Sequence, residues 1–471
     1  MKKPVLFRFS AAVPILVLAV QPLLAQGPSD SDRLEKLERA VEQLQKRNTQ
    51  LEAEIKSLKK QTAAAPTAPA VPAEGPTKKQ VVYDGKTSAE KNVSLPEKPP
   101  VYVLQGGPEI KLTLGGFIQV NFEDGDVSAF EGRFGLTALK DRLRLRRARI
   151  SLIGEFAEQF DFKIEGDFEN SDGISSNRTD FSGTDIFINW HKFPEAQIKL
   201  GQWKAPFGLE QLTPDTKIFT IERSLPTGAL TPERQLGVQL WGQPLTHVWP
   251  EEKDFLTYYA GIFNGNGRNT TISDNNNFMA VGRLELMPFK GKLFGQDSSL
   301  KLGGDILNSR DDKGVNISQT LNLLVNHDGS LSPFVLPGAD ERTAWSADAW
   351  FTIGPFDLIG EYLAEDVDGR TVAGVAPGFK NFDPSGWYVQ GSYFIIPKTV
   401  QAAVKWESLE PDQVADDNIR SITAGLNYYI HGDSVKVMVD YVHTWSDFRE
   451  AHPQFGSDNF DEVIGRVQVI F

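Results

Sequence analysis

From residue 111 to residue 471, the sequence alternates between apolar and polar residues with a period of two. In the first run the apolar or small parity consists of Leu112, Leu114, Gly116, Ile118, Val120 and Phe122. In residues 160–168 the apolar residues are interleaved with Asp161, Lys163, Glu165 and Asp167. Successive side chains of a strand point to opposite faces, so this pattern predicts strands with one apolar and one polar face. Such a charged face is hard to place in a sandwich core.

About 16 runs of this kind occur, and an even number suits a closed antiparallel barrel. We expect the strands to begin near residues 111, 147, 159, 184, 197, 234, 255, 277, 299, 342, 356, 385, 399, 420, 434 and 463. Turn-rich or acidic sequence fills the longer connections, which include residues 264–277, 308–341, 366–384 and 410–418. Alternating short and long connections are typical of a transmembrane barrel. The predicted fold is all-β, a 16-stranded antiparallel transmembrane β-barrel over residues 108–471.

The apolar parity is expected to face lipid. In a bilayer every backbone polar group must be bonded internally, and a sheet meets this condition only when it closes. A barrel of about 16 strands encloses a lumen that holds water, lined by the polar parity. Aromatic residues near the run ends, such as Trp190, Tyr258 and Trp387, suit the membrane interfaces. The last run ends on Phe471, which resembles the assembly signal of outer-membrane barrels. A pair of soluble β-sandwiches or a solenoid is the alternative.

The segments before the barrel have other patterns. Residues 1–25 combine a basic start, an apolar stretch and a small Ala25, which predicts a signal peptide, with an uncleaved helical anchor as the alternative. Residues 31–61 carry apolar residues at heptad spacing, which favours an oligomeric α-helical coiled coil, leaning towards two strands, over a solitary amphipathic helix. Residues 62–105 are rich in Pro and Ala and predict an extended, semi-rigid linker, either a functional tether or filler.

The composition excludes several classes of function. With no Cys, the chain cannot use thiol catalysis, cysteine-ligated zinc, an iron–sulfur cluster or a disulfide scaffold. The formal charge of -13 argues against nucleic acid as a partner. The His residues show no metal-ligand spacing, and neither a Gly-x-Ser-x-Gly motif nor a Walker loop occurs. We therefore expect no enzymatic activity, no bound metal and no other cofactor.

Several segments together resemble the phosphate-selective porin O/P family. They are residues 146–149 (Arg-Arg-Ala-Arg), 160–163 (Phe-Asp-Phe-Lys), 198–210, which contain Gly-Gln-Trp-Lys and Gly-Leu-Glu, and 221–223 (Ile-Glu-Arg). The resemblance covers about residues 110–471 and is strongest over 142–241. It implies a trimeric, 16-stranded barrel whose third loop, here about residues 208–233, folds into the lumen and narrows it.

The resemblance also implies an anion site at this constriction, formed by loop lysines and the Arg of the Glu-Arg pair. Arg223 matches that Arg, but Gln211 stands where the first lysine is expected. Thr216 stands in place of the second lysine, with Lys217 one residue later. These departures predict weaker phosphate selectivity than the family pattern implies.

Strand parity assigns both basic and acidic side chains to the lumen, which predicts a mixed wall. The constriction and anion-binding candidates are Arg147, Arg149, Lys199, Lys217 and Arg223. Other lumen-facing candidates are Asp161, Lys163, Glu165, Asp185, Arg283, Lys405 and Arg466. The parity changes within the five arginines of residues 142–149, so we expect a β-bulge near Arg146 and leave their direction open. The candidates either create a local anion site or bond to luminal carboxylates and stiffen the loop.

The sequence thus predicts an outer-membrane porin, a passive diffusion channel for small hydrophilic solutes, with ions or phosphate as candidate solutes. The alternative is an envelope-tethering protein, in which the coiled coil binds peptidoglycan or the periplasmic envelope and the barrel is mainly an anchor. Expected partners are outer-membrane lipid, lipopolysaccharide and further copies of the chain in a homo-oligomer, which the resemblance implies to be a trimer. With an even number of strands and the usual arrangement of barrel ends, we expect the stalk in the periplasm.

Overall fold

The structure is a computed structural model. It describes residues 46, 77–83, 88–94, 101–103, 109–129, 141–168, 181–270, 272–273, 275–311, 324–325, 331–332, 339–370 and 380–471. The predicted signal peptide lies outside the described residues, and so does the predicted coiled coil apart from Lys46, which is helical. The chain divides into two units, residues 1–97 and 98–471, and each is described by itself.

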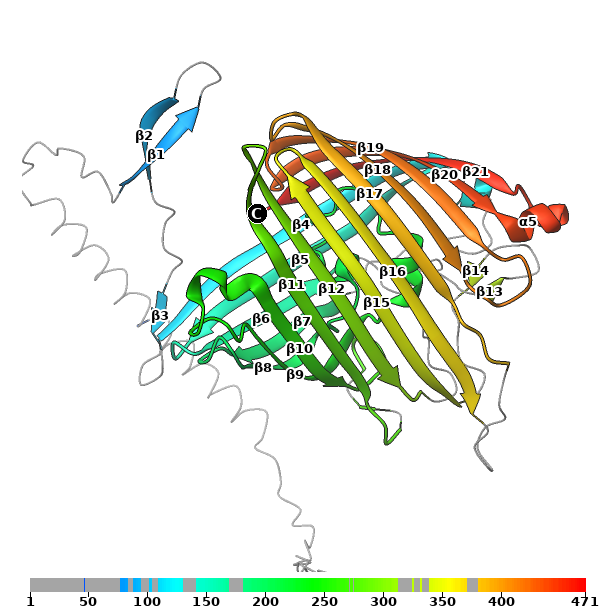
Figure 1. Ribbon diagram of the computed structural model, residues 1–471, viewed down its shortest axis with the longest axis horizontal. Helices are drawn as coiled ribbons and strands as arrows, with labels where there is room; N and C mark the ends of the chain where they lie inside the picture. Colours follow the sequence, from blue (N-terminus) through cyan, green and yellow to red (C-terminus); the bar gives the residue numbers. More distant parts are fainter. Residues whose placement is uncertain are drawn as a thin grey trace, which may run out of the picture. The chain divides into compact units, whose positions relative to one another are not determined.

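The second unit contains a closed antiparallel barrel of sixteen long strands, in which β21 pairs with β4 to complete the wall (Figure 1). The first eight are β4 (Glu109–Gly125), β5 (Asp141–Phe156), β6 (Phe160–Asp167), β7 (Ser182–Trp190), β8 (Gln197–Lys204), β9 (Arg234–Gly242), β10 (Leu256–Phe263) and β11 (Met279–Leu293). The others are β12 (Gln296–Ser309), β15 (Ala339–Ile353), β16 (Phe356–Arg370), β17 (Ser385–Ile396), β18 (Val400–Glu410), β19 (Ile419–His431), β20 (Val435–Ser446) and β21 (Asn459–Ile470). The predicted fold class is confirmed, and the largest difference in strand position is the start of β5, at Asp141 rather than near residue 147.

Long and short connections alternate around the barrel, as expected. We call the end that carries residues 126–140, 205–233 and 310–338 the loop end, and the other the turn end. The short elements of the connections and edge are β3 (Val101–Val103), α3 (Leu209–Leu212), α4 (Leu225–Leu230), η1 (Pro250–Phe255), β13 (Leu324–Val325), β14 (Leu331–Ser332), α5 (Asp447–Ala451) and η2 (Pro453–Phe455). Among the described residues, no helix has both the length and the hydropathy needed to cross a bilayer.

The first unit contains a hairpin within residues 62–105. Within the predicted extended linker, β1 (Thr77–Tyr83) pairs with β2 (Ser88–Ser94) as an antiparallel hairpin. Both strands lie after the Ala-Pro repeats, in sequence of mixed charge and hydropathy.

A β-bulge at Arg146 sets the direction of the arginines of β5. Across from β4, Arg147 pairs with Gln119 and Leu145 pairs with Val120, so Arg146 is the extra residue. This confirms the bulge that the change of parity predicts. An extra residue shifts the side-chain alternation by one, so polar residues on both sides of the bulge can share one face.

All five arginines of β5 consequently face the lumen. Leu143, between two of them, is 76% exposed on the outer face. Arg142 bonds to the buried Glu123, and Arg147 and Arg149 are themselves buried. The inward row, from the loop end towards the middle of the barrel, consists of Arg142, Arg144, Arg146, Arg147 and Arg149.

The outer face is apolar, as the alternation predicts. Large apolar side chains are exposed on every long strand, among them Leu114, Leu200, Val238, Val404, Leu426 and Val467. The opposite parity is polar and mostly buried, as in Gln119, Arg283, Lys405 and Arg466. This arrangement suits hydrocarbon outside and solvated polar groups inside.

Replacing Leu426 with Arg is expected to destabilise the barrel in a bilayer by about 2–4 kcal/mol, the cost of a cation near the midplane. Leu426 lies in the middle of β19, between Ala402 and Val439 of the neighbouring strands. Urea unfolding in lipid vesicles measures the effect, with Leu426→Ala as the control for lost side-chain area. Equal effects of the two substitutions would mean that this face does not meet hydrocarbon.

The lumen is not polar throughout, which corrects the expected polar interior. Towards the loop end, an apolar cluster fills part of it and includes Phe207, Leu230, Phe263, Met279 and Leu363. The helix α4 supplies Leu230 to the cluster and packs against β16, β17 and β18. Apolar burial therefore holds α4 against the inside of the wall.

Candidate pore constriction

The segment between β8 and β9, residues 205–233, crosses the lumen and is held by wall carboxylates at its first turn. The N–H of Gly208 donates to Asp305 at 2.9 Å. The N–H groups of Leu209 and Glu210 donate to the two oxygens of Glu361, at 2.6 and 3.1 Å. Gly208 has a φ of 81°, and a Cβ there would lie 2.8 Å from Thr231 Cγ2. A glycine is therefore required where the chain turns inward.

Two more carboxylates bind the loop backbone further along. Asp440 of β20 accepts from Ile221 N–H at 2.6 Å, and Glu407 of β18 accepts from Leu225 N–H at 2.9 Å. These bonds join the main chain of the loop to two further strands of the wall. The wall thus fixes the backbone of this loop, which we call the constriction loop (residues 208–233).

Cationic wall residues bind residues 211–223 of the same loop. Four of them donate to loop carbonyl groups: Lys204 to Gln211 (2.6 Å), Lys436 to Thr216 (2.9 Å), Arg466 to Ile221 (2.5 Å) and Lys405 to Glu222 (3.0 Å). Three more, Arg146, Arg147 and Arg149, pair with loop carboxylates. Acidic wall groups thus hold the first turn, Ile221 and Leu225 through their N–H groups, and cationic ones hold residues 211–223 through carbonyl and carboxylate groups.

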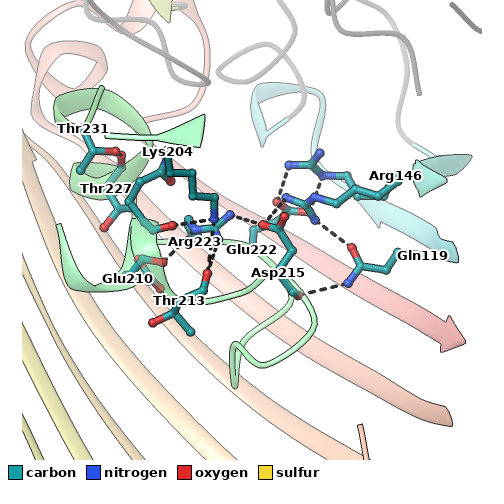
Figure 2. A network of polar contacts seen from close by, with 12 residues as sticks. Gln119, Arg146, Lys204, Glu210, Thr213, Asp215, Glu222, Arg223, Thr227 and Thr231 are labelled. Atoms are coloured by element: carbon teal, nitrogen blue, oxygen red, sulfur yellow. Dashed lines mark hydrogen bonds and ion pairs between the residues drawn. The ribbon is translucent and has the colours of Figure 1, made fainter. Parts of the chain in front are cut away.

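Asp215 is the centre of an arginine cluster (Figure 2). Arg149 contacts its carboxylate at 2.7 Å and Arg147 at 3.4 Å, and Arg223 of the loop itself completes the set. Burial alone would raise the pKa of Asp215, but the positive charges of Arg147, Arg223 and further cations hold this pKa well below its usual range. The carboxylate is therefore ionised and bound to all three arginines.

Glu222 is a second centre, next to the first. Arg146 binds it through two nitrogens, at 2.9 and 3.0 Å, and Arg466 of β21 contacts it at 2.6 Å. Burial would raise the pKa of Glu222, yet Arg146 and Arg466 keep this pKa well below its usual range. Figure 2 shows Arg146 reaching Glu222 while Arg223 lies between Thr213, Glu210 and Asp215.

The five constriction candidates lie in three places. Arg147, Arg149 and Arg223 meet at Asp215. Lys217 is exposed, and it lines a small pocket with Phe219, Trp350 and Tyr388 rather than joining the cluster. Lys199 lies among aromatic rings of β7, β8 and β9.

The other candidates line the lumen in ion pairs or hydrogen bonds. Lys163 contacts Glu165 at 2.8 Å and Asp185 at 2.9 Å. Asp161 accepts from Asn189 at 3.0 Å. Arg283, which has no exposed side-chain surface, contacts both Asp305 and Asp348. Lys405 and Arg466 hold the constriction loop as described above.

The sequence reasoning missed the two carboxylates at the centres of the clusters. Asp215 and Glu222 lie in a loop, where no periodicity indicates a direction. One signal was available: residues 142–149 contain five arginines. If such arginines point inward and are buried, they need anionic groups nearby, which predicts carboxylates in the loop. Lys204, at the end of β8, was missed for the same reason: its loop acceptors are backbone groups that sequence does not mark.

Comparisons with known proteins agree with the barrel fold. Among curated proteins no sequence matches the chain. A loop-deletion mutant of OmpT, an outer membrane protein of Vibrio cholerae, is similar in fold, with 13% identity, a TM-score of 0.51, and coverage of 77% of this chain and 99% of that one. An anion-selective porin from Comamonas acidovorans is also similar, at 12% identity and a TM-score of 0.51, over 77% of this chain and 100% of that one.

The family comparison is more specific than the fold comparison. The model of the family described as phosphate-selective porin O and P matches residues 118–471, which covers the barrel from within β4 to the last residue. Its match includes the arginine row, the constriction loop and the Glu-Arg pair. Family and fold are those of an outer-membrane channel rather than an enzyme. The chain therefore belongs to the phosphate-selective porin O and P family.

Proposed function

We propose that this outer-membrane channel passes small hydrophilic solutes by diffusion and prefers anions at its constriction. The observation that carries the proposal is the inward arginine row of β5, which the bulge at Arg146 creates. The row runs from the loop end to the segment where seven wall cations contact residues 211–223. Charge of one sign along a water-filled path raises the local concentration of ions of the opposite sign.

The same geometry supports a moderate preference rather than tight phosphate binding. The three arginines at Asp215 already share a carboxylate, and Gln211 and Thr216 replace the two lysines that the family pattern places in the loop. Among the candidate anion-binding residues, Lys217 is exposed and forms no ion pair within the described residues. For Arg147, Arg149 and Arg223, a role in stiffening the loop is therefore better supported than a role as an anion site.

The setting of the channel completes the proposal. The apolar outer face supports contact with outer-membrane lipid, and lipopolysaccharide would surround the loop end. We propose a trimer, from the resemblance to the family, with the turn end and the amino-terminal stalk in the periplasm. Peptidoglycan contact through residues 31–61 rests on residues outside those described, and no described feature favours tethering as the main function.

Reversal potentials in a potassium chloride gradient across planar bilayers test the anion preference. The wild-type channel is expected to pass chloride in preference to potassium, and replacement of both Arg142 and Arg144 by Met is expected to reduce the preference at least twofold. These two residues lie in the arginine row but away from Asp215. The proposal would be contradicted if the wild-type channel were cation-selective, or if the double substitution left its selectivity unchanged.

A further inference from the structure

Lys199 lies at the centre of a group of aromatic rings on the luminal wall. Its Nζ is 4.5 Å from the ring centroid of Phe187 and 5.6 Å from those of Trp203 and Trp241. Tyr259 of β10 stacks on Trp241, with ring centroids 6.0 Å apart and planes 4° from parallel. We call these five residues the Lys199 panel. It is made from four consecutive strands, β7 to β10.

The ammonium group of Lys199 has no acceptor among the described residues. The carboxylates on the neighbouring strands are bound elsewhere: Asp185 to Lys163 and Arg234, and Asp161 to Asn189. The aromatic faces attract the ammonium charge but cannot accept its hydrogen bonds as an oxygen anion would. The panel therefore offers a positive charge with free donors on an apolar surface.

Hydrogen bonds hold the rings around this charge. Trp203 Nε1 donates to Gln239 at 3.2 Å, and Trp241 Nε1 donates to Asn189 at 3.0 Å. Asn189 and Gln239 are the residues paired with Lys199 on either side of β8. Both indole rings are thus fixed before any solute arrives, which reduces the entropic cost of binding.

The panel is open to the lumen on the turn-end side of the constriction loop. Phe187, Lys199, Trp241 and Tyr259 are each partly exposed, whereas Trp203 is buried behind them. Lys199 precedes the loop-binding Lys204 by five residues of β8, so their backbone positions lie roughly 16 Å apart along the strand. Trp203, the buried back of the panel, is the neighbour of Lys204 in sequence. A solute that passes the constriction therefore meets the panel as a second, separate surface.

We propose that the Lys199 panel binds organic anions that carry a flat apolar ring, of which an aromatic carboxylate is the simplest. The carboxylate would accept from Lys199 while the ring packs against Trp241 and Phe187. Inorganic phosphate or acetate would gain only the charged contact, and a cation would be repelled by Lys199. The inference rests on the proposed channel function and names a solute class for it.

Block of chloride current by benzoate tests the inference in planar bilayers with the full-length protein. The wild-type channel is expected to be half-blocked at a benzoate concentration about fivefold below that of acetate, because only benzoate gains the ring contact. Lys199→Met, which keeps the apolar stem, should raise the benzoate concentration needed for half-block about tenfold. Trp241→Leu should raise the benzoate value but leave the acetate value within twofold.

The matched control is Lys111→Met, which removes a lysine of β4 that pairs with Glu155 and removes the same charge. It is expected to change the benzoate value less than twofold. Equal block by benzoate and acetate, or a benzoate value that Lys199→Met leaves unchanged, would overturn the inference. Calorimetric titration of the detergent-solubilised protein with benzoate separates the two proposals, since it detects panel binding even if the channel conducts no chloride. Circular dichroism verifies that each variant is folded. If Lys199→Met does not fold, Lys199→Gln is measured in its place.

Discussion

Replacing Asp215 with Asn is expected to convert the arginine cluster into a phosphate site. The substitution keeps the side-chain size and the Gln119 bond to the backbone carbonyl of residue 215, but it removes the charge shared by Arg147, Arg149 and Arg223. Free guanidinium groups bind phosphate through paired hydrogen bonds. Phosphate should then block chloride current at a concentration at least tenfold lower than in the wild type, about 1.4 kcal/mol of added affinity.

The control for this substitution is Asp185→Asn, which removes another luminal carboxylate, one that pairs with Lys163 and Arg234. Both variants gain the same net charge, so a general electrostatic effect would appear in both. Equal phosphate block in the wild type and in the Asp215 variant would show that phosphate does not reach the cluster. In wild-type protein the lowered pKa of Asp215 keeps the cluster paired at about pH 4, where ordinary aspartates are about half protonated.

Replacing Glu361 with Ala is expected to release the first turn of the constriction loop. Two buried N–H groups, of Leu209 and Glu210, would lose their acceptor, and leaving a buried donor unsatisfied costs about 1–3 kcal/mol. Of the three hydrogen bonds described for this turn, the one from the Gly208 N–H to Asp305 would remain. We expect a higher single-channel conductance and more open-channel noise, because the loop would leave its docked position part of the time.

Asp357→Ala is the matched control, since Asp357 lies on the same strand, β16, and bonds to Trp350 and Thr352 of β15 rather than to the loop. Glu361→Gln retains one carbonyl acceptor and should give an intermediate conductance. If the Ala variant at residue 361 shows wild-type conductance and noise, the carboxylate does not hold the loop in place.

The sixteen strands could be predicted because lipid imposes the pattern that identifies them. The outer residues, such as Leu426 and Val404, must be apolar along every strand, while the inner ones have no such constraint. The bulge could be predicted as well, because Leu143 and Leu145 fall on the wrong parity relative to Ile150 unless one residue is extra. The inward direction of the arginines then follows from the bulge.

The site could be predicted only in part. The sequence identified Arg147, Arg149 and Arg223, but not Asp215, which joins them. Asp215 lies 66 residues from Arg149, and Glu222 lies 244 residues from Arg466. Such pairs depend on how a loop without periodicity folds back across the barrel, and local pattern carries no information about that path. The apolar cluster around α4 was missed for a related reason, since its wall residues share a parity with charged neighbours.

The constriction loop is fastened to the wall largely through its main chain. Because amide hydrogens and carbonyl oxygens are present whatever the side chains are, the outline of the aperture is independent of many of the residues that line it. Exposed positions such as Lys217 are therefore open to exchange without rebuilding the scaffold. A barrel of this design can acquire new solute preferences by point changes, while its dimensions stay the same.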